Sequence, residues 1–326
     1  MKRFSAIILV FIIAITLFAG CSEKAEAYKL GTSMTVAYKE GQVGNVSADT
    51  TVAAVVLDKN GKIVDCKLDT VQSKVDISDG FLADGAAKLV FKSKYELGDD
   101  YNMKTYGGAI AEWYEQADAF CSFCIGKTVQ EVKNIAVDDA GKATDADLLA
   151  GCTIGVKDYI TAVVSACEDE MAKEFESKSD VSLGLFVKGA VDSANDSENN
   201  DGAVKLVVSY AATVIDSDEL LASATVDAAQ PEFKYNDDGE VTAVSYKGSK
   251  REQKEGYGMV AYAGATAEWY EQADSLCDWL IGLSVDEIKS VPDSSGYATD
   301  ADLSAGCTIN IAGDINNIVT AMSKAK

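Results

Sequence analysis

The segment at residues 111–118 (AEWYEQAD) returns without a change at residues 267–274, and this repeat determines how the chain is organised. Two further segments recur in the same order: ATDADL at residues 143–148 and 298–303, and AGCTI at residues 150–154 and 305–309. The distance between the copies is far longer than the period of a solenoid, whose units span about 20–50 residues. The sequence therefore predicts a duplicated domain.

Each copy begins with a strand pattern and ends with a helical one. The β-rich runs at residues 51–57 and 63–68 flank the turn at residues 58–61 (DKNG), and Asn-Gly between such runs is a strong hairpin signal. Apolar residues then recur on one helix face: Trp113, Ala117, Phe120, Cys121 and Cys124 in the first copy, and Trp269, Ala273, Leu276, Cys277 and Leu280 in the second. We expect Trp113 to fill the core; flavin stacking by Trp113 or Tyr114 is the alternative. Strands followed by helices predict an α+β fold with a mostly antiparallel sheet in each copy.

The order of these patterns sets the expected boundaries along the chain. We expect a signal peptide at residues 1–20, a tether at 21–29, the first domain at 30–167, a linker at 168–180 and the second domain at 181–326. The linker is rich in charged residues, and we expect it to be helical. The tether is polar and contains glutamate and lysine.

The first residues of the chain have the pattern of an export signal. Lys2 and Arg3 precede an apolar run at residues 6–19 that ends in small residues. The stretch at residues 17–21 (LFAGC) resembles the lipobox of bacterial lipoproteins, in which the cysteine receives a diacylglycerol. That resemblance implies lipidation of Cys21 and a location on the extracytoplasmic face of the bacterial cell membrane. An uncleaved transmembrane anchor is the alternative, but the run is shorter than the roughly 20 residues that span a bilayer.

Composition excludes several classes of function. The formal net charge of −23 argues against binding to nucleic acid, which needs lysine and arginine to neutralise its phosphates. The chain contains no histidine, which excludes imidazole-ligated zinc and haem sites and catalytic triads with a histidine base. Chemistry must therefore come from carboxylates, thiols, hydroxyls or a bound cofactor.

The AGCTI segment has the residue types of an attachment loop. Gly151 permits unusual backbone shapes and close approach of a neighbouring chain, and Thr153 presents a hydroxyl ahead of the amphipathic segment at residues 156–166. A helix that starts behind this loop offers free N–H groups to a phosphate. Asp147 is placed to accept the hydroxyl proton or to help hold Mg²⁺. The alternative is that Thr153 only caps the helix, but a cap does not explain the Asp, Gly and Cys repeated beside it.

The loop resembles the attachment motif of the FMN-binding domain family, which reads approximately Asp-x-x-Ser-Gly-Ala-Thr. This family occurs in the flavin subunits of sodium-pumping and electron-transporting complexes and in two-domain lipoproteins of extracellular electron transfer. In its motif the threonine hydroxyl forms a phosphoester with FMN, installed by an FAD-dependent FMN transferase. The matching positions are Asp147, Gly151 and Thr153 in the first copy, and Asp302, Gly306 and Thr308 in the second. This chain has Ala150 and Ala305 in place of the serine, and Cys152 and Cys307 in place of the alanine.

The resemblance implies a membrane-anchored, extracytoplasmic electron carrier with one covalent FMN on each threonine. Its expected partners are the transferase and a membrane electron donor, such as a quinone- or NADH-linked reductase. A covalent bond suits this location, because a flavin held at micromolar affinity, about 8 kcal/mol, dissociates into a dilute exterior. The alternative function is a cofactor-free surface lipoprotein that binds a ligand or a protein through the paired loops. An enzyme acting through carboxylates ranks third, since no suitable carboxylate pair stands out.

The cysteines allow two interpretations. Besides Cys21, two cysteines occur at equivalent positions in both copies: Cys121 and Cys152 in the first copy, and Cys277 and Cys307 in the second. One hypothesis joins the two cysteines of each copy in a disulfide, which an exported location permits. The other treats them as buried thiols that act as small apolar side chains. Because Cys152 and Cys307 adjoin the acceptor threonines, they are also candidates for contact with a flavin.

Overall fold

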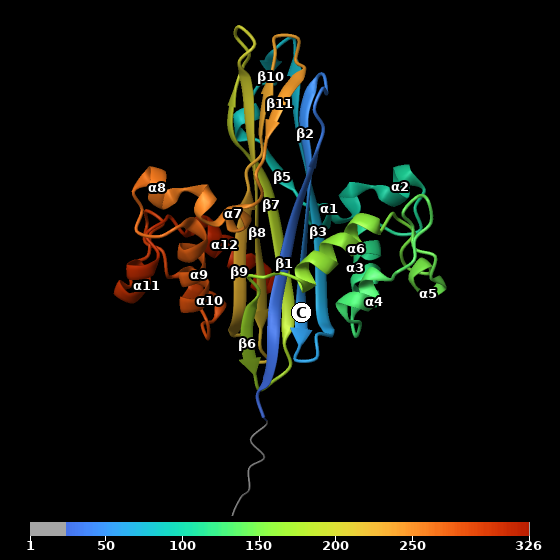
Figure 1. Ribbon diagram of the computed structural model, residues 1–326, viewed down its shortest axis with the longest axis vertical. Helices are drawn as coiled ribbons and strands as arrows, with labels where there is room; N and C mark the ends of the chain where they lie inside the picture. Colours follow the sequence, from blue (N-terminus) through green and yellow to red (C-terminus); the bar gives the residue numbers. More distant parts are fainter. Residues whose placement is uncertain (1–23, 326) are drawn as a thin grey trace, which may run out of the picture.

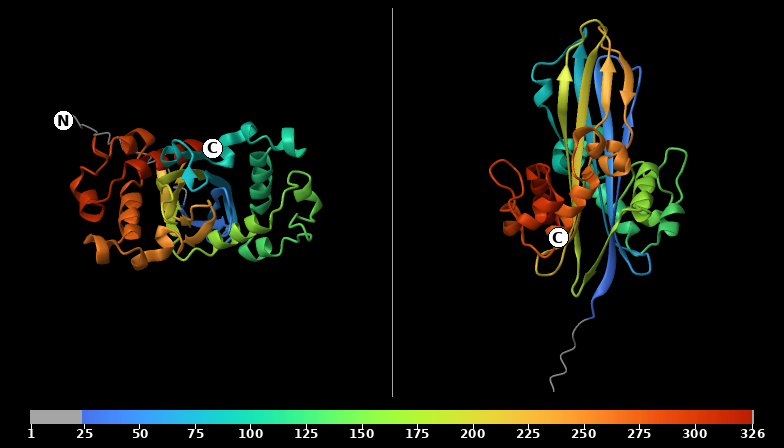
Figure 2. Two further views of the ribbon diagram at one scale, coloured as in Figure 1. Left: turned by 90° about the horizontal axis from the view of Figure 1, so that it is seen from above. Right: turned by 60° about the vertical axis from the view of Figure 1, so that its left-hand side comes forward.

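The computed structural model describes residues 24–325, so the expected signal peptide and Cys21 lie outside the described residues. Its strands form two sheets that face each other between two groups of helices (Figures 1 and 2). The first sheet contains β1 (Glu26–Tyr38), β2 (Asn45–Asp58), β3 (Ile63–Ser78), β4 (Phe81–Leu82) and β6 (Lys173–Ser177). The second contains β5 (Val90–Lys92), β7 (Ser182–Asn195), β8 (Gly202–Ile215), β9 (Leu221–Ala229), β10 (Glu232–Tyr235) and β11 (Val241–Ser245).

All pairs of neighbouring strands in these sheets run antiparallel. The order in the first sheet is β4-β3-β2-β1-β6, and the order in the second is β11-β10-β8-β7-β5, with β9 paired to β8. This arrangement confirms the predicted α+β class and the antiparallel sheets. The predicted hairpin also forms between β2 and β3, where the Asp58 N–H donates to the Lys62 carbonyl at 2.9 Å and Gly61 has a φ of 74°.

The helices gather in two lobes on opposite outer sides of the sheets (Figure 2). The first lobe contains α1 (Lys94–Leu97), α2 (Met103–Gly107), α3 (Trp113–Cys124), α4 (Val129–Lys133), α5 (Ala146–Leu149) and α6 (Lys157–Cys167). The second lobe contains α7 (Lys250–Gln253), α8 (Met259–Ala263), α9 (Trp269–Trp279), α10 (Val285–Lys289), α11 (Ala301–Gly306) and α12 (Ala312–Lys324). Three short 3-10 helices complete the elements: η1 (Ala86–Lys88), η2 (Gly98–Tyr101) and η3 (Lys254–Tyr257). Within residues 24–325, no helix has the length and apolar character that crossing a membrane requires.

The central residues of β2 are apolar at every position because both faces of this strand are covered. Ala53 and Val55 pack against the helices of the first lobe, whereas Val52 and Ala54 face the second sheet. A strand that is covered on both faces lacks the polar and apolar alternation of a half-exposed strand. The molecule is therefore layered as helices, sheet, sheet and helices.

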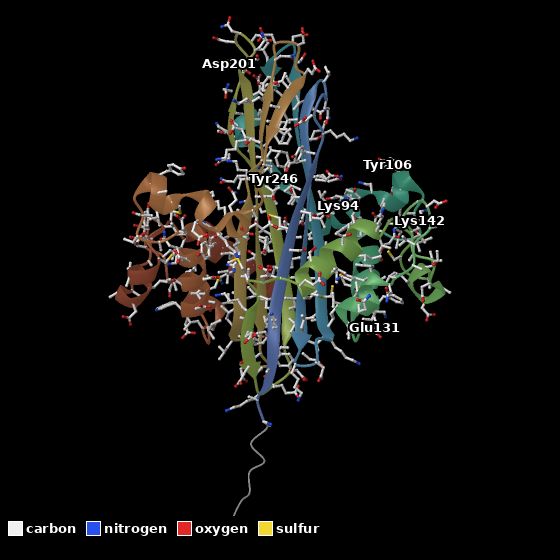
Figure 3. The ribbon with its side chains drawn as sticks, in the orientation of Figure 1. Lys94, Tyr106, Glu131, Lys142, Asp201 and Tyr246 are labelled. Carbon is white, nitrogen blue, oxygen red and sulfur yellow. The ribbon has the colours of Figure 1, made fainter. Side chains whose placement is uncertain are left out.

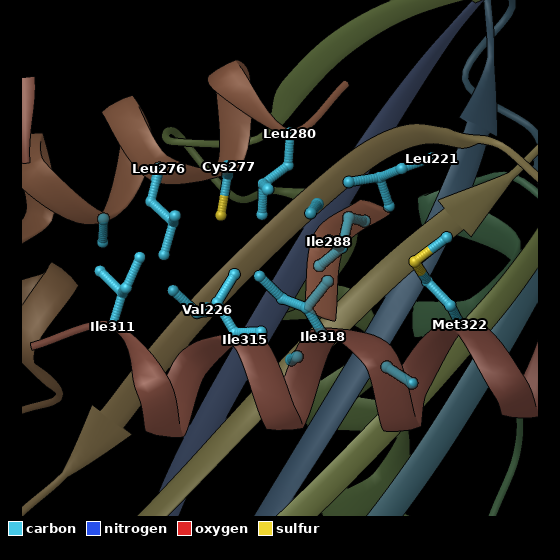
Figure 4. Close-up of a cluster of buried hydrophobic side chains, with 14 of the residues drawn as sticks. Leu221, Val226, Leu276, Cys277, Leu280, Ile288, Ile311, Ile315, Ile318 and Met322 are labelled. Carbon is cyan, nitrogen blue, oxygen red and sulfur yellow. The ribbon is translucent and has the colours of Figure 1, made fainter. Parts of the chain in front are cut away.

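Each lobe has its own core on the outer face of a sheet. In the second lobe, Leu276 from α9 and Ile315 and Ile318 from α12 meet Val226 of β9 (Figure 4). In the first lobe, the predicted apolar face of α3, including Trp113, is buried against β3. This placement confirms that Trp113 fills the core.

Two glycines fix how closely the long helices approach the sheets. A Cβ atom added at Gly31 of β1 would lie 2.1 Å from the Ala166 carbonyl oxygen of α6. A Cβ atom added at Gly184 of β7 would lie 2.0 Å from the Ala321 carbonyl oxygen of α12. Both positions therefore need glycine because a helix backbone rests directly on the strand.

The segment between the two copies differs from our expectation. Residues 168–180 were expected to form a helix, but they contain the edge strand β6, which pairs with β1. The residues of β6 alternate between exposed glutamates and more buried neighbours, and Phe175 stacks on Tyr28 with ring centroids 5.5 Å apart. A two-residue alternation of this kind suits a strand and not a helix. β1 also begins at Glu26, inside the segment that we expected to be a tether.

The two halves of the chain share strands and a core. β5 comes from the first half of the chain but pairs with β7 in the second sheet. Leu30 and Val71 from the first sheet pack with Leu183 and Val208 from the second. An apolar core therefore joins the two sheets, and the two lobes pack on the outer faces of this pair of sheets.

Candidate functional site

Thr153 and Thr308 are each held by a buried glutamine of their lobe. Gln116 accepts hydrogen bonds from the Thr153 N–H at 2.8 Å and from the Thr153 hydroxyl at 3.1 Å. Gln272 accepts the equivalent bonds from Thr308 at 2.8 and 3.0 Å. Both glutamines lie in the AEWYEQAD segment, so the two repeated segments meet in space.

The glutamine amide is itself oriented by the backbone. The Gln116 Nε2 donates to the Ala111 carbonyl, and the Gln272 Nε2 donates to the Ala267 carbonyl, both at 2.9 Å. With its nitrogen engaged in this way, each amide presents its oxygen to the threonine. The role of these glutamines was not predicted from the sequence, although their identity in both copies was the signal that could have found them.

The threonines do not cap the following helices. α6 begins at Lys157 with Val156 at its N-cap, and α12 begins at Ala312 with Ile311 at its N-cap. Capping, the alternative role for the threonines, is therefore wrong. Thr308 is exposed and Thr153 is half-buried, so each threonine can be reached from solvent.

The glycine and cysteine beside each threonine have packing roles. A Cβ atom at Gly151 would lie 2.8 Å from the Ala119 Cβ of α3, and one at Gly306 would lie 2.9 Å from the Ser275 Oγ of α9. Neither glycine has a positive φ, so close approach and not backbone freedom accounts for both. Cys152 and Cys307 are buried in the lobe cores. These contacts explain much of why the loop is the same in both copies.

The remaining predicted site residues are two exposed aspartates. The Asp147 N–H donates to Asp145, and the Asp302 N–H donates to Asp300, while neither aspartate is hydrogen-bonded to the nearby threonine. Asp145 and Asp300 serve as the N-caps of α5 and α11. Within residues 24–325, no three His, Cys, Asp or Glu side chains are grouped as a metal ion would require. The threonine, glycine and cysteine of each loop therefore lie together, whereas Asp147 and Asp302 are not bonded to the threonines.

A cleft lies beside the Thr308 loop in the second lobe. Its volume is about 640 Å³, and its lining includes Lys250, Tyr257, Met259, Tyr262, Trp269 and Ile309. The Lys250 Nζ lies 4.9 Å from the centre of the Trp269 ring and 5.1 Å from that of Tyr257. An ammonium group over two aromatic faces is held by cation–π attraction. Tyr262 is 90% exposed at the rim of this cleft.

The first lobe has the same lysine and aromatic arrangement. The Lys94 Nζ lies 5.1 Å from the centre of the Tyr101 ring and 5.4 Å from that of Trp113. Tyr106 on α2 is 85% exposed, as Tyr262 is in the second lobe. Figure 3 labels Lys94 near the sheets and Tyr106 farther out on the same lobe. These lysines and tyrosines were also missed by the sequence analysis, because they lie in weakly repeated segments.

Buried carboxylates position the helices that carry these lysines. Asp69 accepts hydrogen bonds from the Thr70 and Tyr95 N–H groups, at 2.7 and 3.1 Å. Asp227 accepts them from Ala228 and Arg251, at 2.7 and 3.1 Å. Burial raises the pKa of each carboxyl to about 6, against the hydrogen bonds that favour the charged form.

A second pair of carboxylates caps the helices with the exposed tyrosines. Glu112 accepts the Met103 and Lys104 N–H groups at 2.7 and 3.1 Å. Glu268 accepts those of Met259 and Val260 at 2.8 and 3.1 Å. The start of α2 and of α8 is therefore tied to the helix that holds the threonine.

All seven cysteines of residues 24–325 are free thiols in the structure. The Cys121–Cys152 and Cys277–Cys307 couples are therefore not disulfides here, and the buried-thiol interpretation describes them. Burial raises the pKa of the Cys152 thiol to about 11 and that of Cys277 to about 12. Such thiols stay protonated at neutral pH and are poor nucleophiles.

Comparisons with known proteins give one partial similarity. No family model matches the chain, and no solved structure matches it. Over 118 residues the chain is 30% identical to a protein named chlorophenol reductase from Desulfitobacterium hafniense. The match covers 32% of this chain and 36% of that protein, so it spans about a third of each. A similarity of this extent leaves the family of the chain undetermined.

Proposed function

We propose that the protein is an electron carrier, anchored by a lipid on Cys21 to the extracytoplasmic face of a bacterial membrane. FMN is joined covalently to Thr153 and Thr308, each in an FMN-binding-like domain. The observation that carries the proposal is the buried glutamine in each lobe, which bonds the threonine hydroxyl and lies on the same helix as a tryptophan whose ring a lysine covers. The partial similarity to a protein named as a reductase is consistent with a redox role.

The residues around the threonines fit a flavin in size and chemistry. The cleft of about 640 Å³ beside Thr308 lies within the roughly 300–1,000 Å³ of small-molecule sites. Tyr262, which lines the cleft and is 90% exposed, offers an aromatic face to a planar ring system. Lys250 supplies a positive charge to a phosphate or to a reduced ring. Bound FMN would supply two-electron redox chemistry at each site.

Attachment requires a bond between the threonine Oγ1 and the FMN phosphorus, with FAD as donor and AMP as leaving group. The hydroxyl donates its hydrogen bond to an amide oxygen, which is too weak a base to remove the proton. We infer that the transferase provides the base. Once the ester has formed, the threonine N–H still bonds the glutamine, so the loop keeps its support.

The proposal is tested by expressing the protein with an FAD-dependent FMN transferase and measuring its intact mass. We expect two FMN additions in the native sequence, one in Thr153→Val or Thr308→Val, and none in the double variant. Thr161→Val and Thr320→Val are matched controls, because these threonines bond backbone carbonyls within α6 and α12. Covalent flavin retained by the double variant would refute the assignment. A colourless native protein would favour a cofactor-free binding protein.

A further inference from the structure

The two threonine sites differ at one position of the helix that follows the loop. Tyr159 is the sixth residue after Thr153, and Asp314 is the sixth after Thr308. Both belong to the first turn of the helix, in α6 and α12. The two positions are therefore equivalent, but one carries a neutral phenol and the other a carboxyl.

In the first lobe, Tyr159 is part of the aromatic group. The Trp113 Nε1–H donates to the Tyr159 hydroxyl at 3.0 Å, and the two rings meet edge to face with centroids 6.1 Å apart. The phenol also lies near Cys152 and near Lys94, whose positive charge acts on it. The position is thus beside both the lysine and the threonine loop.

In the second lobe, Asp314 occupies that place. The charges of Asp314 and Lys250 act on each other, and Asp314 likewise acts on the Cys307 thiol. Burial raises the pKa of Asp314 to about 6, so the carboxyl is mostly ionised at pH 7. The Trp269 indole N–H has no acceptor among residues 24–325, in contrast to that of Trp113. Lys250 is therefore close enough to a carboxylate for the two charges to interact, whereas the residue at the equivalent position beside Lys94 is a phenol.

Most other charges near the sites are matched between the lobes or paired with an opposite charge, as Arg251 is with Asp274 at 2.6 Å. Asp99 and Glu255 each accept the hydroxyl of an equivalent tyrosine, and Glu112 and Glu268 have equivalent caps. Lys205 lines the second cleft but is paired with Asp192 at 3.1 Å. Lys157 and Asp158 of the first lobe are opposite charges that Ala312 and Gly313 replace in the second. Lys104, replaced by Val260, adds positive charge to the first lobe only.

Resting on the proposed function, we propose that Asp314 makes a flavin on Thr308 harder to reduce than a flavin on Thr153. Reduction adds electron density, which a neighbouring carboxylate opposes through a medium of low dielectric constant. At the equivalent position of the first lobe, the phenol of Tyr159 carries no charge that opposes reduction. Position 314 therefore sets a difference in reduction potential between the two sites.

The test compares proteins with one flavin each. Thr153→Val leaves the flavin on Thr308, and Thr308→Val leaves it on Thr153; spectroelectrochemical titration gives the potential of each. We expect at least a tenfold lower ratio of reduced to oxidised flavin for the Thr308 site at one applied potential, about 30 mV for two electrons. Adding Asp314→Asn to Thr153→Val should remove most of the difference. Adding Tyr159→Asp to Thr308→Val should lower that potential, whereas Asp158→Asn should leave it nearly unchanged.

The outcomes separate this inference from the proposed function. Equal potentials, or a Thr308 site that does not respond to Asp314→Asn, overturn the inference while flavin attachment stands. Absence of flavin from both single variants, seen as a missing colour and a missing added mass, overturns both. Asp314→Asn keeps the shape of the side chain, and Tyr159→Asp tests the same charge in the other lobe. A fold disturbed by one substitution therefore leaves the other to decide.

Discussion

Replacing Gln272 with leucine should destabilise the Thr308 loop by an amount that depends on the hydrogen bonds that the glutamine side chain makes. The side chain accepts two bonds from Thr308 and donates one to Ala267, and it is 1% exposed. Each bond contributes roughly 0.5–1.5 kcal/mol, and the carbonyl of the half-buried Ala267 loses its partner. Water can reach the exposed Thr308, which offsets part of the loss. We expect Gln272→Leu to lower the free energy of unfolding by about 2–3 kcal/mol.

Urea denaturation followed by circular dichroism measures this change as a lower midpoint at an unchanged slope. Combining Gln272→Leu with Thr308→Val completes a double-mutant cycle, in which only the hydroxyl bond is shared. We expect a coupling of about 1 kcal/mol. Gln130→Leu is the control, because that exposed amide bonds only Asn134 on the surface of α4. A coupling near zero would refute the view that the glutamine holds the hydroxyl.

Three further predictions follow from the support of the site. Gly151→Ala should destabilise the protein by about 1–3 kcal/mol, because its Cβ meets the Ala119 Cβ; Gly306→Ala should cost less, since it meets the movable Ser275 side chain. Urea midpoints check this order, and equal effects would contradict it. The pKa of Asp69 is about 6 when folded and 3.8 as its ordinary value, so its contribution to stability is complete below pH 3.8 and is lost as pH rises through 6. Relative to Asp69→Asn, the native protein should therefore gain up to about 3 kcal/mol of unfolding free energy between pH 7 and pH 4, and a constant difference would exclude the shift. Thiol titration of denatured, unreduced material should find every cysteine of residues 24–325 free, and a count lower by two or four would reveal disulfides.

Secondary structure was predicted correctly from the sequence where it depends on local residue patterns alone. The Asn-Gly hairpin and the apolar face of α3 formed as expected, because turn chemistry and helical spacing are local properties. The linker was mistaken for a helix because its charges suggested solvent exposure on all sides. Its strand is stabilised by pairing with β1, a contact distant in sequence that no local pattern reports.

The site was only partly predictable for the same reason. The threonines were identified as candidates because their loop has the same sequence in both copies. Two different constraints keep that sequence the same, and the sequence alone does not separate them. Gly151 and Cys152 are constrained by packing against α3 and the core, whereas the half-buried Thr153 is constrained by its hydrogen bonds to Gln116. The role of Gln116 depends on the meeting of α3 with the loop. That meeting is a property of the tertiary structure.

The most direct test of the account is peptide mass spectrometry of the protein matured in its native host. We predict that the peptides containing Thr153 and Thr308 each carry the mass of one FMN in phosphoester linkage, and that both absorb visible light. Unmodified peptides at both threonines, from colourless protein produced beside an active transferase, would contradict the electron-carrier function.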